Sequence, residues 1–321
     1  MSAIFETTIL GSSAAIPTSL RHTSAQLLKY HNLYFLIDCA EGCQMQLRRL
    51  KKPLMKISHI FISHLHGDHY LGLPGLLFSL HLLGREKEMH VYSPPGLEEM
   101  INLQYKIAGL TPSFQIRYHD LLEGETRVYE DDFLTVETIA MEHRLPTFGF
   151  LFREKPKERT IRKESLSKYR IPVARRGGIK KGEDLITEDG TRIPNEEITL
   201  PPPPPRSYAF CSDTAYTESF IEQVRHADLL YHEATFMHDK AGIARQKLHS
   251  TTIEAATLAK KAEAGTLMIG HYSARYKELE DFLREASTVF PETILAREGE
   301  TVTVKRSEAH STTGNKDTNR A

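Results

Sequence analysis

The sequence predicts a layered α/β protein. Through its first two-thirds, short apolar runs of strand length alternate with segments of helical pattern, as expected when helices cover sheets. The chain has 321 residues, of which 40% are hydrophobic and 26% charged. It is therefore long enough to bury a sizeable core and ordinary in composition for a globular protein. No stretch approaches the roughly 20 apolar residues of a membrane span, so we expect no membrane partner.

The elements expected before residue 142 alternate between the two types. Strands are expected at Ala3–Leu10, Ser24–Lys29, Tyr34–Asp38, Ile57–Ser63, Met89–Ser93, Phe114–His119, Thr126–Tyr129 and Phe133–Met141, and helices at Cys43–Leu50, Leu71–Leu83 and Glu98–Ile107. The pair His31-Asn32 separates two of these strands and predicts a turn.

The segment from Arg153 to Lys181 differs from the rest of the chain. It carries twelve Lys and Arg residues against three Glu residues, a local charge of +9 in a chain whose net charge is −1. The run Pro201–Pro205 follows and predicts a stiff spacer. We therefore expect residues 153–205 to be an inserted basic arm that protrudes from the body.

The alternation of strands and helices resumes after the arm. Strands are expected at Tyr208–Ser212, Asp228–His232 and Thr266–Gly270, and helices at Thr217–Val224 and Thr251–Ala262. Thr251 and Glu254 have the spacing of a capping box. We expect residues 1–306 to form a single catalytic domain with the arm inserted, and residues 307–321, which are polar, to be a disordered tail.

The cysteines and the N-terminus favour a cytoplasmic protein. The three cysteines, Cys39, Cys43 and Cys211, form an odd set without paired spacing, which suits a reducing compartment. No basic flank and long apolar run mark a secretory signal near Met1. A metal pair of Cys39 and Cys43 is an alternative, but Cys39 ends an apolar run and is interpreted as core.

The run His64-Leu65-His66-Gly67-Asp68-His69 follows an apolar strand and precedes a helical segment. Three imidazoles and a carboxylate within six residues need polar partners, and a bound metal satisfies them together. In an extended loop, His64 and His66 can point one way while Asp68 and His69 point another. One loop can then supply ligands to two adjacent ions.

Three further residues that suit metal binding follow predicted strands. They are His143, Asp213 and His271. Taken alone, a histidine after a strand is more often a surface residue. Their shared position at strand ends favours a common site, because functional side chains of layered α/β proteins gather there.

Seven motifs together resemble the ribonuclease Z family of the metallo-β-lactamase superfamily, over about residues 9–296. They are Asp38-x-x-Glu41-Gly42-x-Gln44, the run Ser63 to His69, Tyr92-Ser93-Pro94-Pro95-Gly96, Ser212-Asp213-Thr214, His232-Glu233-Ala234-Thr235, Leu248-His249-Ser250-Thr251 and Gly270-His271-Tyr272-Ser273-x-Arg275-Tyr276. The resemblance implies an αββα sandwich of two mixed sheets flanked by helices.

The resemblance also implies a dinuclear site. His64, His66 and His143 would bind one Zn²⁺, Asp68, His69 and His271 the other, and Asp213 would bridge them, giving two Zn²⁺ per subunit. The same ligands accept Mn²⁺ or Fe²⁺. By the same resemblance Asp68 orients and deprotonates the attacking water, His249 protonates the leaving oxygen, and Glu233 holds the second ring nitrogen of His249. The alternative for His249 is a neighbour of a helix N-cap.

The substrate contacts expected from the resemblance lie in the arm and in a loop near the N-terminus. They are Arg175, Arg176, Lys180 and Lys181 of the arm, and Arg21. The alternative for the arm is a solvated charged loop. The family's Gly-Pro step is missing from the arm, and of its Pro-x-Lys-x-Arg-Asn loop only Pro17 and Arg21 match. These departures bear on the geometry of the arm and on the cleavage position.

The expected function is removal of 3′ trailers from precursors of transfer RNA (tRNA), which leaves a 3′-hydroxyl on the tRNA and a 5′-phosphate on the trailer. The family usually acts as a homodimer in which one subunit's arm serves the other's active site, so we expect a homodimer. Two alternatives are open: a small-molecule phosphodiesterase or other metallo-hydrolase of the same fold, and a non-catalytic RNA-binding scaffold.

Overall fold

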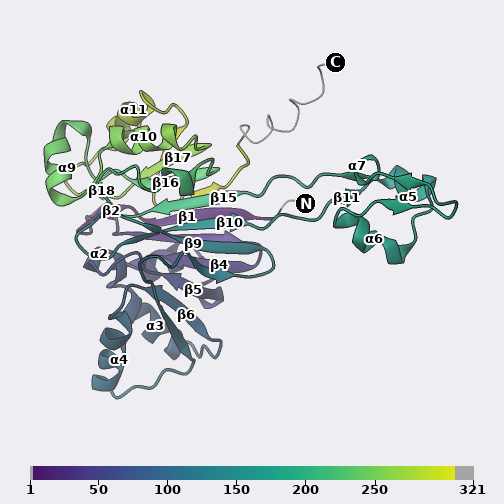
Figure 1. Ribbon diagram of the computed structural model, residues 1–321. Helices are drawn as coiled ribbons and strands as arrows, with labels where there is room; N and C mark the ends of the chain where they lie inside the picture. The colour runs from purple at the N-terminus through teal and green to yellow at the C-terminus, as the bar shows by residue number, and fades with distance from the viewer. Residues whose placement is uncertain (1–2, 308–321) are drawn as a thin grey trace.

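The computed structural model of the protein describes residues 3–307. Two seven-stranded sheets pack face to face, and helices cover their outer faces (Figure 1). The αββα sandwich that the resemblance implied is therefore confirmed. Apart from Ser307, the expected disordered tail lies outside the described residues.

The first sheet has the strand order β20-β1-β3-β4-β5-β6-β7. Its strands are β20 (Thr301–Thr303), β1 (Phe5–Gly11), β3 (Ala25–Tyr30), β4 (Leu33–Ile37), β5 (Ile57–Phe61), β6 (Met89–Ser93) and β7 (Ile116–Asp120). From β4 to β7 the strands are parallel. The helices that follow them in the chain are α1 (Cys43–Arg49), η1 (Leu54–Lys56), α2 (Gly67–Tyr70), α3 (Leu73–Leu82) and α4 (Leu97–Ile107).

The second sheet has the strand order β19-β17-β16-β15-β10-β9-β8. Its strands are β19 (Thr293–Leu295), β17 (Thr266–Gly270), β16 (Leu229–Glu233), β15 (Ser207–Cys211), β10 (Phe148–Glu154), β9 (Leu134–Ala140) and β8 (Arg127–Glu130). Its helices are α8 (Ile221–Val224), η2 (His238–Lys240), α9 (Ala241–Lys247), α10 (Thr252–Lys261) and α11 (Glu280–Ser287). A short parallel pair, β2 (Ser13–Ala14) with β18 (Tyr272–Ser273), links the halves near the site.

The hydrophobic core is divided by the sheets into layers. Between the sheets lies an aromatic cluster that includes Phe35 and Phe61 of the first sheet and Phe150 and Tyr208 of the second. There are two further clusters, one between the first sheet and its helices and one between the second sheet and its helices. Full burial of one such aromatic side chain is worth about 1.5–3 kcal/mol. The two sheets therefore form a rigid support for the loops at their edges.

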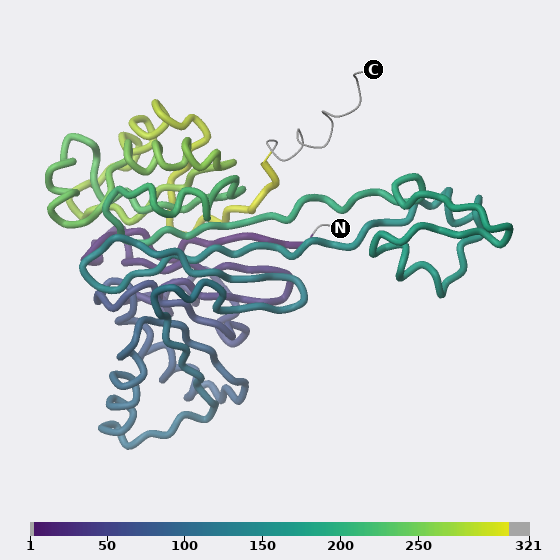
Figure 2. Tube along the Cα trace, viewed as in Figure 1, coloured from purple at the N-terminus to yellow at the C-terminus, as the bar shows by residue number. Residues whose placement is uncertain are grey.

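Residues 155–206 leave the body between β10 and β15 and extend away from it as an arm (Figures 1 and 2). The arm contains β11 (Thr160–Ile161), α5 (Lys163–Lys168), α6 (Val173–Lys180), β12 (Leu185–Ile186), β13 (Arg192–Ile193), α7 (Asn195–Ile198) and β14 (Thr199–Leu200). A small core of its own holds it together, made of Ile161, Ile171, Ile179, Leu185 and Ile198. The segment is therefore folded at its far end although it is poor in large apolar residues.

Most predicted elements of the body are present with ends shifted by a few residues. The helix predicted at Leu71–Leu83 is present as α3, and a separate short helix that was not predicted, α2, precedes it. They part at Gly72, where a Cβ would meet the carbonyl oxygen of Ala40 at 1.9 Å, so the turn needs a glycine. The helix predicted at Thr217–Val224 was too long, since only α8 forms. The strand β10 and the helices α9 and α11 were not predicted.

The capping box of α10 is confirmed, because the Thr251 side chain accepts from the Glu254 backbone N–H and the Glu254 side chain accepts from Thr251. Cys39 and Cys43 are buried in the core between the first sheet and its helices, which confirms the core interpretation. Within residues 3–307, no helix combines the length and the apolar character that a membrane crossing requires.

Candidate active site

The predicted ligands lie at one edge of the sandwich, because the sheet topology brings several strand ends together there. β15, β16 and β17 are parallel, and β9 has the same direction, since β10 is antiparallel to both β9 and β15. His143, Asp213 and His271 follow the carboxyl ends of β9, β15 and β17. The loop from His64 to His69 follows β5 of the opposite sheet.

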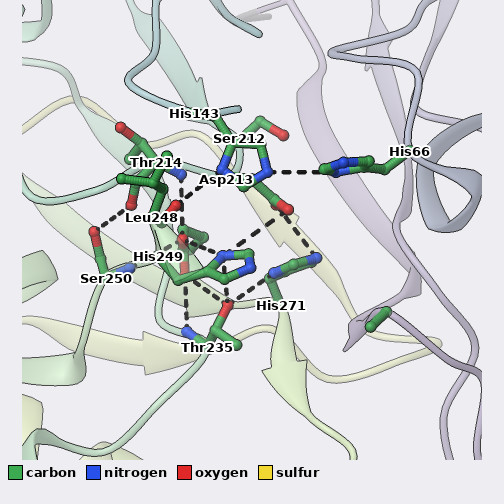
Figure 3. Close-up of polar contacts among 12 residues, drawn as sticks. His66, His143, Ser212, Asp213, Thr214, Thr235, Leu248, His249, Ser250 and His271 are labelled. Atoms are coloured by element: carbon green, nitrogen blue, oxygen red, sulfur yellow. Dashed lines mark hydrogen bonds and ion pairs between the residues drawn. The ribbon is translucent and has the colours of Figure 1, made fainter. Parts of the chain in front are cut away.

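The first group of side chains that could hold a metal comprises His64, His66, His143 and Asp213. His66 Nδ1 lies 2.9 Å from His64 Nε2 and 3.3 Å from His143 Nε2. His64 Nε2 lies 3.7 Å from Asp213 Oδ2. Figure 3 shows His66 and His143 pointing toward one another beside Asp213.

The second group comprises Asp68, His69 and His271. His271 Nε2 lies 3.4 Å from Asp68 Oδ2, and His69 Nε2 lies 3.6 Å from the same oxygen. Asp213 Oδ1 is 3.2 Å from His271 Nε2. Asp213 thus directs one oxygen to each group, and this grouping is the one that the resemblance implies.

Two buried atoms in the cluster indicate that a cation belongs there. Within residues 3–307, His69 Nε2 and Asp213 Oδ1 are buried without a hydrogen-bond partner, and they face each other at 3.5 Å. Unpaired buried polar atoms cost free energy. Imidazole and carboxylate donors in this arrangement suit a divalent transition metal, so the residues present fit a metal centre.

The charges around His69 and His64 also favour a bound metal cation. Burial lowers the pKa of His69, but the carboxylates of Asp213, Asp38 and Asp68 raise it well above its usual value. The same carboxylates that attract a proton to His69 would also attract a metal cation. Burial and the neighbouring His69 lower the pKa of His64, which keeps that imidazole in the neutral form that binds metals.

Three imidazoles of the cluster, those of His69, His143 and His271, are oriented by a contact at their other nitrogen. His69 Nδ1 donates to Asp38 Oδ2 at 2.7 Å, and Asp38 Oδ1 also accepts from the Ser63 backbone N–H. His143 Nδ1 donates to the Leu248 carbonyl at 2.9 Å, and His271 Nδ1 donates to Thr235 Oγ1 at 2.9 Å. Such contacts fix the tautomer and direct the free nitrogen to the metal.

The sequence reasoning quoted the motifs that contain Asp38 and Thr235 but gave these residues no role. In the structure Asp38 follows a buried strand and adopts φ 55°, a left-handed conformation that non-glycine residues seldom adopt without a structural reason, but the sequence carried no signal of this. Both residues support ligands and do not belong to the ligand groups themselves.

Glu233 and His249 form a hydrogen-bonded pair beside the cluster. His249 Nδ1 donates to Glu233 Oε1 at 2.9 Å, and the backbone N–H groups of Thr214, Thr235 and Ser250 also donate to the Glu233 carboxylate (Figure 3). Burial lowers the pKa of His249, but Glu233 and then Asp213 raise it to about 9. His249 is therefore held protonated at neutral pH with Nε2 free to donate.

A cleft with a volume of about 410 Å³ opens over the cluster. Its lining includes His66, Asp68, His143, Asp213, His249 and His271, together with Glu41, Leu71, Arg144 and Lys247. Five of the candidate ligands and His249 thus line one opening, while His64 and His69 lie buried behind them.

Arg21 is mostly buried and holds two loops together. Its side chain is 7% exposed, and its guanidinium donates to the carbonyl of Tyr276 at 2.6 Å, with longer contacts to the carbonyls of Ser273 and Lys277. Arg21 therefore joins the N-terminal loop to the loop after β18, where it also lines a small pocket. Its contact with the substrate stays a prediction.

The predicted basic side chains of the arm differ from one another. Arg175, Lys180 and Lys181 are exposed. Arg176 is half-buried, and its guanidinium donates to the Ile171 carbonyl, so it stabilises the turn between α5 and α6. Residues 182–205 add six acids and one arginine, which reduces the net charge of residues 153–205 to +4. The basic character is therefore concentrated in the first half of the arm.

Solved structures with the same fold place the protein in a class. A metallo-β-lactamase fold protein from Bacillus subtilis is 18% identical with a TM-score of 0.67, covering 94% of this chain and 100% of that chain. The short form of human tRNase Z is 25% identical with a TM-score of 0.67, covering 94% and 99%. The protein is thus a metallo-β-lactamase fold protein with a metal-binding cluster of histidines and aspartates.

Relatives in sequence define the family within that class. The ribonuclease Z of Bacteroides fragilis is 43% identical over 295 residues, covering 92% of this chain and 97% of the relative. That of Cytophaga hutchinsonii is 45% identical over 297 residues, covering 92% and 95%. The chain belongs to the ribonuclease Z family, as its motifs predicted. A family model described as anti-Pycsar protein Apyc1 matches residues 5–155.

Proposed function

We propose that this protein is a metal-dependent endoribonuclease that removes 3′ trailers from tRNA precursors, leaving a 3′-hydroxyl on the tRNA and a 5′-phosphate on the trailer. The observation that carries the proposal is the hydrogen bond between His249 and Glu233 beside the two ligand groups, in a chain of the ribonuclease Z family. A proton donor adjacent to a metal centre is what cleavage of a phosphodiester with a poor leaving group requires.

The metal centre proposed here holds two Zn²⁺ ions. His64, His66 and His143 would be ligands of one ion, Asp68, His69 and His271 of the other, and Asp213 would bridge them. When bound, the two ions would supply a nucleophilic water at neutral pH and neutralise charge on the scissile phosphate. Mn²⁺ or Fe²⁺ could occupy the same donors, because imidazole and carboxylate ligands accept all three.

The remaining steps belong to the side chains. Asp68 is kept ionised, since burial raises its pKa but His69 and His271 lower it well below its usual range, so it can orient the attacking water and accept its proton. The bond from the water oxygen to phosphorus forms as the bond from phosphorus to the 3′ oxygen of the tRNA breaks. His249 Nε2 transfers its proton to that oxygen, while Glu233 stabilises the ring through Nδ1.

The arm supplies RNA binding in this proposal. Arg175, Lys180 and Lys181 are exposed on the basic half of the arm, where they can contact phosphates without reading sequence. Residues 1–306 would form one catalytic domain with the RNA-binding arm inserted at 153–205. Support for a contact remote from the cleft comes from the length by which the arm extends from the body (Figure 2).

The assembly and location proposed are those of the family. Two copies of the chain would form a homodimer, the arm of one serving the active site of the other, in the cytoplasm. Measurement of the molar mass in solution by light scattering tests the dimer. A mass near 36.5 kDa at working concentrations would reject it.

Deletion of the arm separates tRNA processing from small-molecule hydrolysis. β10 and β15 are antiparallel neighbours, with Arg153 paired to Ser207, so a short Gly-Ser turn can replace residues 157–203. The variant should hydrolyse bis(p-nitrophenyl) phosphate at the wild-type rate yet cleave a tRNA precursor at least 100-fold more slowly at low substrate. Equal loss on both substrates, or wild-type cleavage of the precursor, would favour a small-molecule phosphodiesterase or a different use of the arm.

A further inference from the structure

Two basic side chains line the cleft, and both lie on the side of His249. They are Arg144, next to the ligand His143, and Lys247, two residues before His249. Both side chains are exposed. Neither forms an ion pair with an acid among the described residues, so both charges are available to a ligand.

Two hydrogen bonds fix the segments that carry these cations against each other. His143 Nδ1 donates to the Leu248 carbonyl at 2.9 Å, and Arg144 Nη2 donates to the Gln246 carbonyl at 3.4 Å. The loop after β9 and the end of α9 are thereby tied together. Arg144 and Lys247 consequently form one positive margin of the cleft, here called the Arg144–Lys247 margin.

The other side of the cleft has a different character. Its lining comes from Ala15, Pro17, Gly67, Leu71 and Glu41. Leu71 is 55% exposed, and Glu41 is an exposed acid. The lining there includes no basic side chain among the described residues. The cleft is therefore asymmetric, with its positive charge beside the proton donor.

This asymmetry sets a direction for the RNA strand, provided that the proposed function holds. The proton donor must contact the leaving oxygen, which is the 3′ oxygen of the tRNA, so the last tRNA ribose lies next to His249. The trailer stays bonded to the scissile phosphorus through its own 5′ oxygen and extends from the phosphorus in another direction. We propose that the Arg144–Lys247 margin binds the backbone phosphates at the 3′ end of the tRNA and so determines which way the strand enters the cleft.

The expected recognition is of charge and not of base identity. Arginine and lysine contacts to phosphates release counterions and position the strand without reading sequence. Each contact should be worth about fivefold in affinity at 0.1 M salt and should add about one to the slope of log Kd against log salt concentration.

Binding of mature tRNA tests the assignment without relying on cleavage. The metal-loaded full chain is titrated with mature tRNA that carries either normal linkages or neutral methylphosphonates at its last two linkages. The proteins are the wild type, the double variant Arg144→Gln/Lys247→Gln, and Arg245→Gln. The last is a matched control, because Arg245 is an exposed cation of the same helix α9 outside the cleft lining.

We expect the neutral linkages to weaken binding by the wild type and by Arg245→Gln roughly tenfold or more. The double variant should bind normal tRNA as weakly as the wild type binds the tRNA with neutral linkages. Its affinity should not fall further when the linkages are neutral. Metal content should match the wild type, which shows that His143 is undisturbed. As a second probe, methylphosphonates at the first two trailer linkages should change the KM of precursor cleavage by the same factor in all three proteins.

Two results would overturn the assignment while leaving the proposed function intact. In the first, neutral tRNA linkages weaken tRNA binding by the double variant as much as binding by the wild type. In the second, neutral trailer linkages change the KM of the double variant by a different factor from that of the wild type. A wild-type protein that neither binds tRNA nor cleaves the precursor would overturn the assignment and the proposed function together.

Discussion

At the active site, several candidate histidine ligands use one ring nitrogen for the cluster and the other for the surrounding protein. His69 presents Nε2 to Asp213 and holds Asp38 through Nδ1. His271 presents Nε2 and holds Thr235 in the same way. The cluster is therefore ordered by the fold before any ion enters, which lowers the free-energy cost of binding one.

Replacing His249 by alanine separates proton transfer from metal binding. His249 lies close to Asp213 and His271, but it is not one of the predicted ligands and its Nδ1 donates to Glu233. Metal content measured by atomic emission should therefore stay near that of the wild type. Cleavage should fall by about 10²–10⁴-fold, the usual contribution of a positioned general acid. Cleavage at the wild-type rate would remove His249 from the mechanism.

Replacing Asp38 by asparagine tests the supporting contacts. The amide can accept less strongly from His69 Nδ1 than the carboxylate does, so metal affinity should fall by about 10–100-fold, as measured by competition with a chelator. Asp120→Asn is the control, because Asp120 is exposed at the end of β7. Equal metal affinity in the two variants would show that Asp38 serves folding alone.

The sequence was informative about side chains whose chemistry excludes ordinary packing. The dense run from His64 to His69 cannot be explained by a core, and His143, Asp213 and His271 were suggested by their positions after strands. Asp38 and Thr235 could not be assigned in this way, because a single acid or hydroxyl after a strand has many ordinary explanations. The burial of Arg21 was not foreseen, since sequence alone does not tell a buried guanidinium from an exposed one.

At the scale of elements, the arm begins at a buried ion pair between neighbouring strands. Arg206, before β15, donates through Nη2 to Glu154 Oε1, at the end of β10, at 2.7 Å. Its guanidinium also donates to the carbonyls of Val304 and Ala3. This pair ties both ends of the described chain to the point where the arm leaves, and so fixes the direction of the two connecting segments at that point.

Replacing Glu154 by glutamine should leave the buried charge of Arg206 without its partner. The free energy of unfolding should fall by about 3 kcal/mol, measured by urea denaturation. The double variant Glu154→Gln/Arg206→Met should recover part of the loss, because the buried charge of Arg206 is removed and only the more distant pair of Glu154 with Arg306 is still broken. Glu130→Gln, which breaks the exposed pair with Lys155, is the control and should change stability little. A similar loss in both single variants would contradict this account of the arm root.

The elements predicted best were strands bounded by turn residues, such as β6 and β17, because their apolar runs end abruptly. β10 was missed because it is buried along nearly its whole length, so its side chains do not alternate between buried and exposed. It also adjoins the basic segment, which made its end hard to recognise in the sequence. The arm's short elements were not predicted because its core has few members. They are widely spaced in the chain, and they pack only after the arm has folded.

At the scale of the whole molecule, two sheets meet so that loops from both supply one site. The halves contribute different groups: the first sheet provides the run from His64 to His69, and the second provides His143, Asp213, Glu233 and His271. The candidate metal site is therefore complete only when both halves of the molecule contribute their residues. The αββα layering could be inferred only through resemblance, since alternation of strands and helices fixes the fold class but not the pairing of sheets.

The first sheet also contains an acid-sensitive element away from the cleft. His59, His90 and His119 stack across β5, β6 and β7, with His59 and His90 ring centroids 4.9 Å apart. Burial, and then the neighbouring His90 and His119, lower the pKa of His59 to about 4. His59 is therefore neutral in the folded protein where the unfolded chain already takes up a proton. Stability is complete above pH 6.5 and declines as the pH falls toward 4.

Replacing His59 by glutamine should reduce this dependence on pH. Between pH 7 and pH 5 the wild type should lose about 2 kcal/mol of unfolding free energy more than His59→Gln does. Chemical denaturation of both proteins at both pH values measures the difference, and contributions from the metal site cancel between them. An identical pH dependence in the two proteins would show that His59 titrates normally.

Mapping the product ends from a single tRNA precursor tests the central claim most directly. The purified, metal-loaded protein is incubated with a tRNA precursor that carries a 3′ trailer, with and without a chelator. The account predicts one metal-dependent cut at the junction, giving a tRNA with a 3′-hydroxyl and an intact trailer with a 5′-phosphate. A ladder of shortened trailers, a tRNA with a 3′-phosphate, or no cleavage by the metal-loaded protein would contradict it.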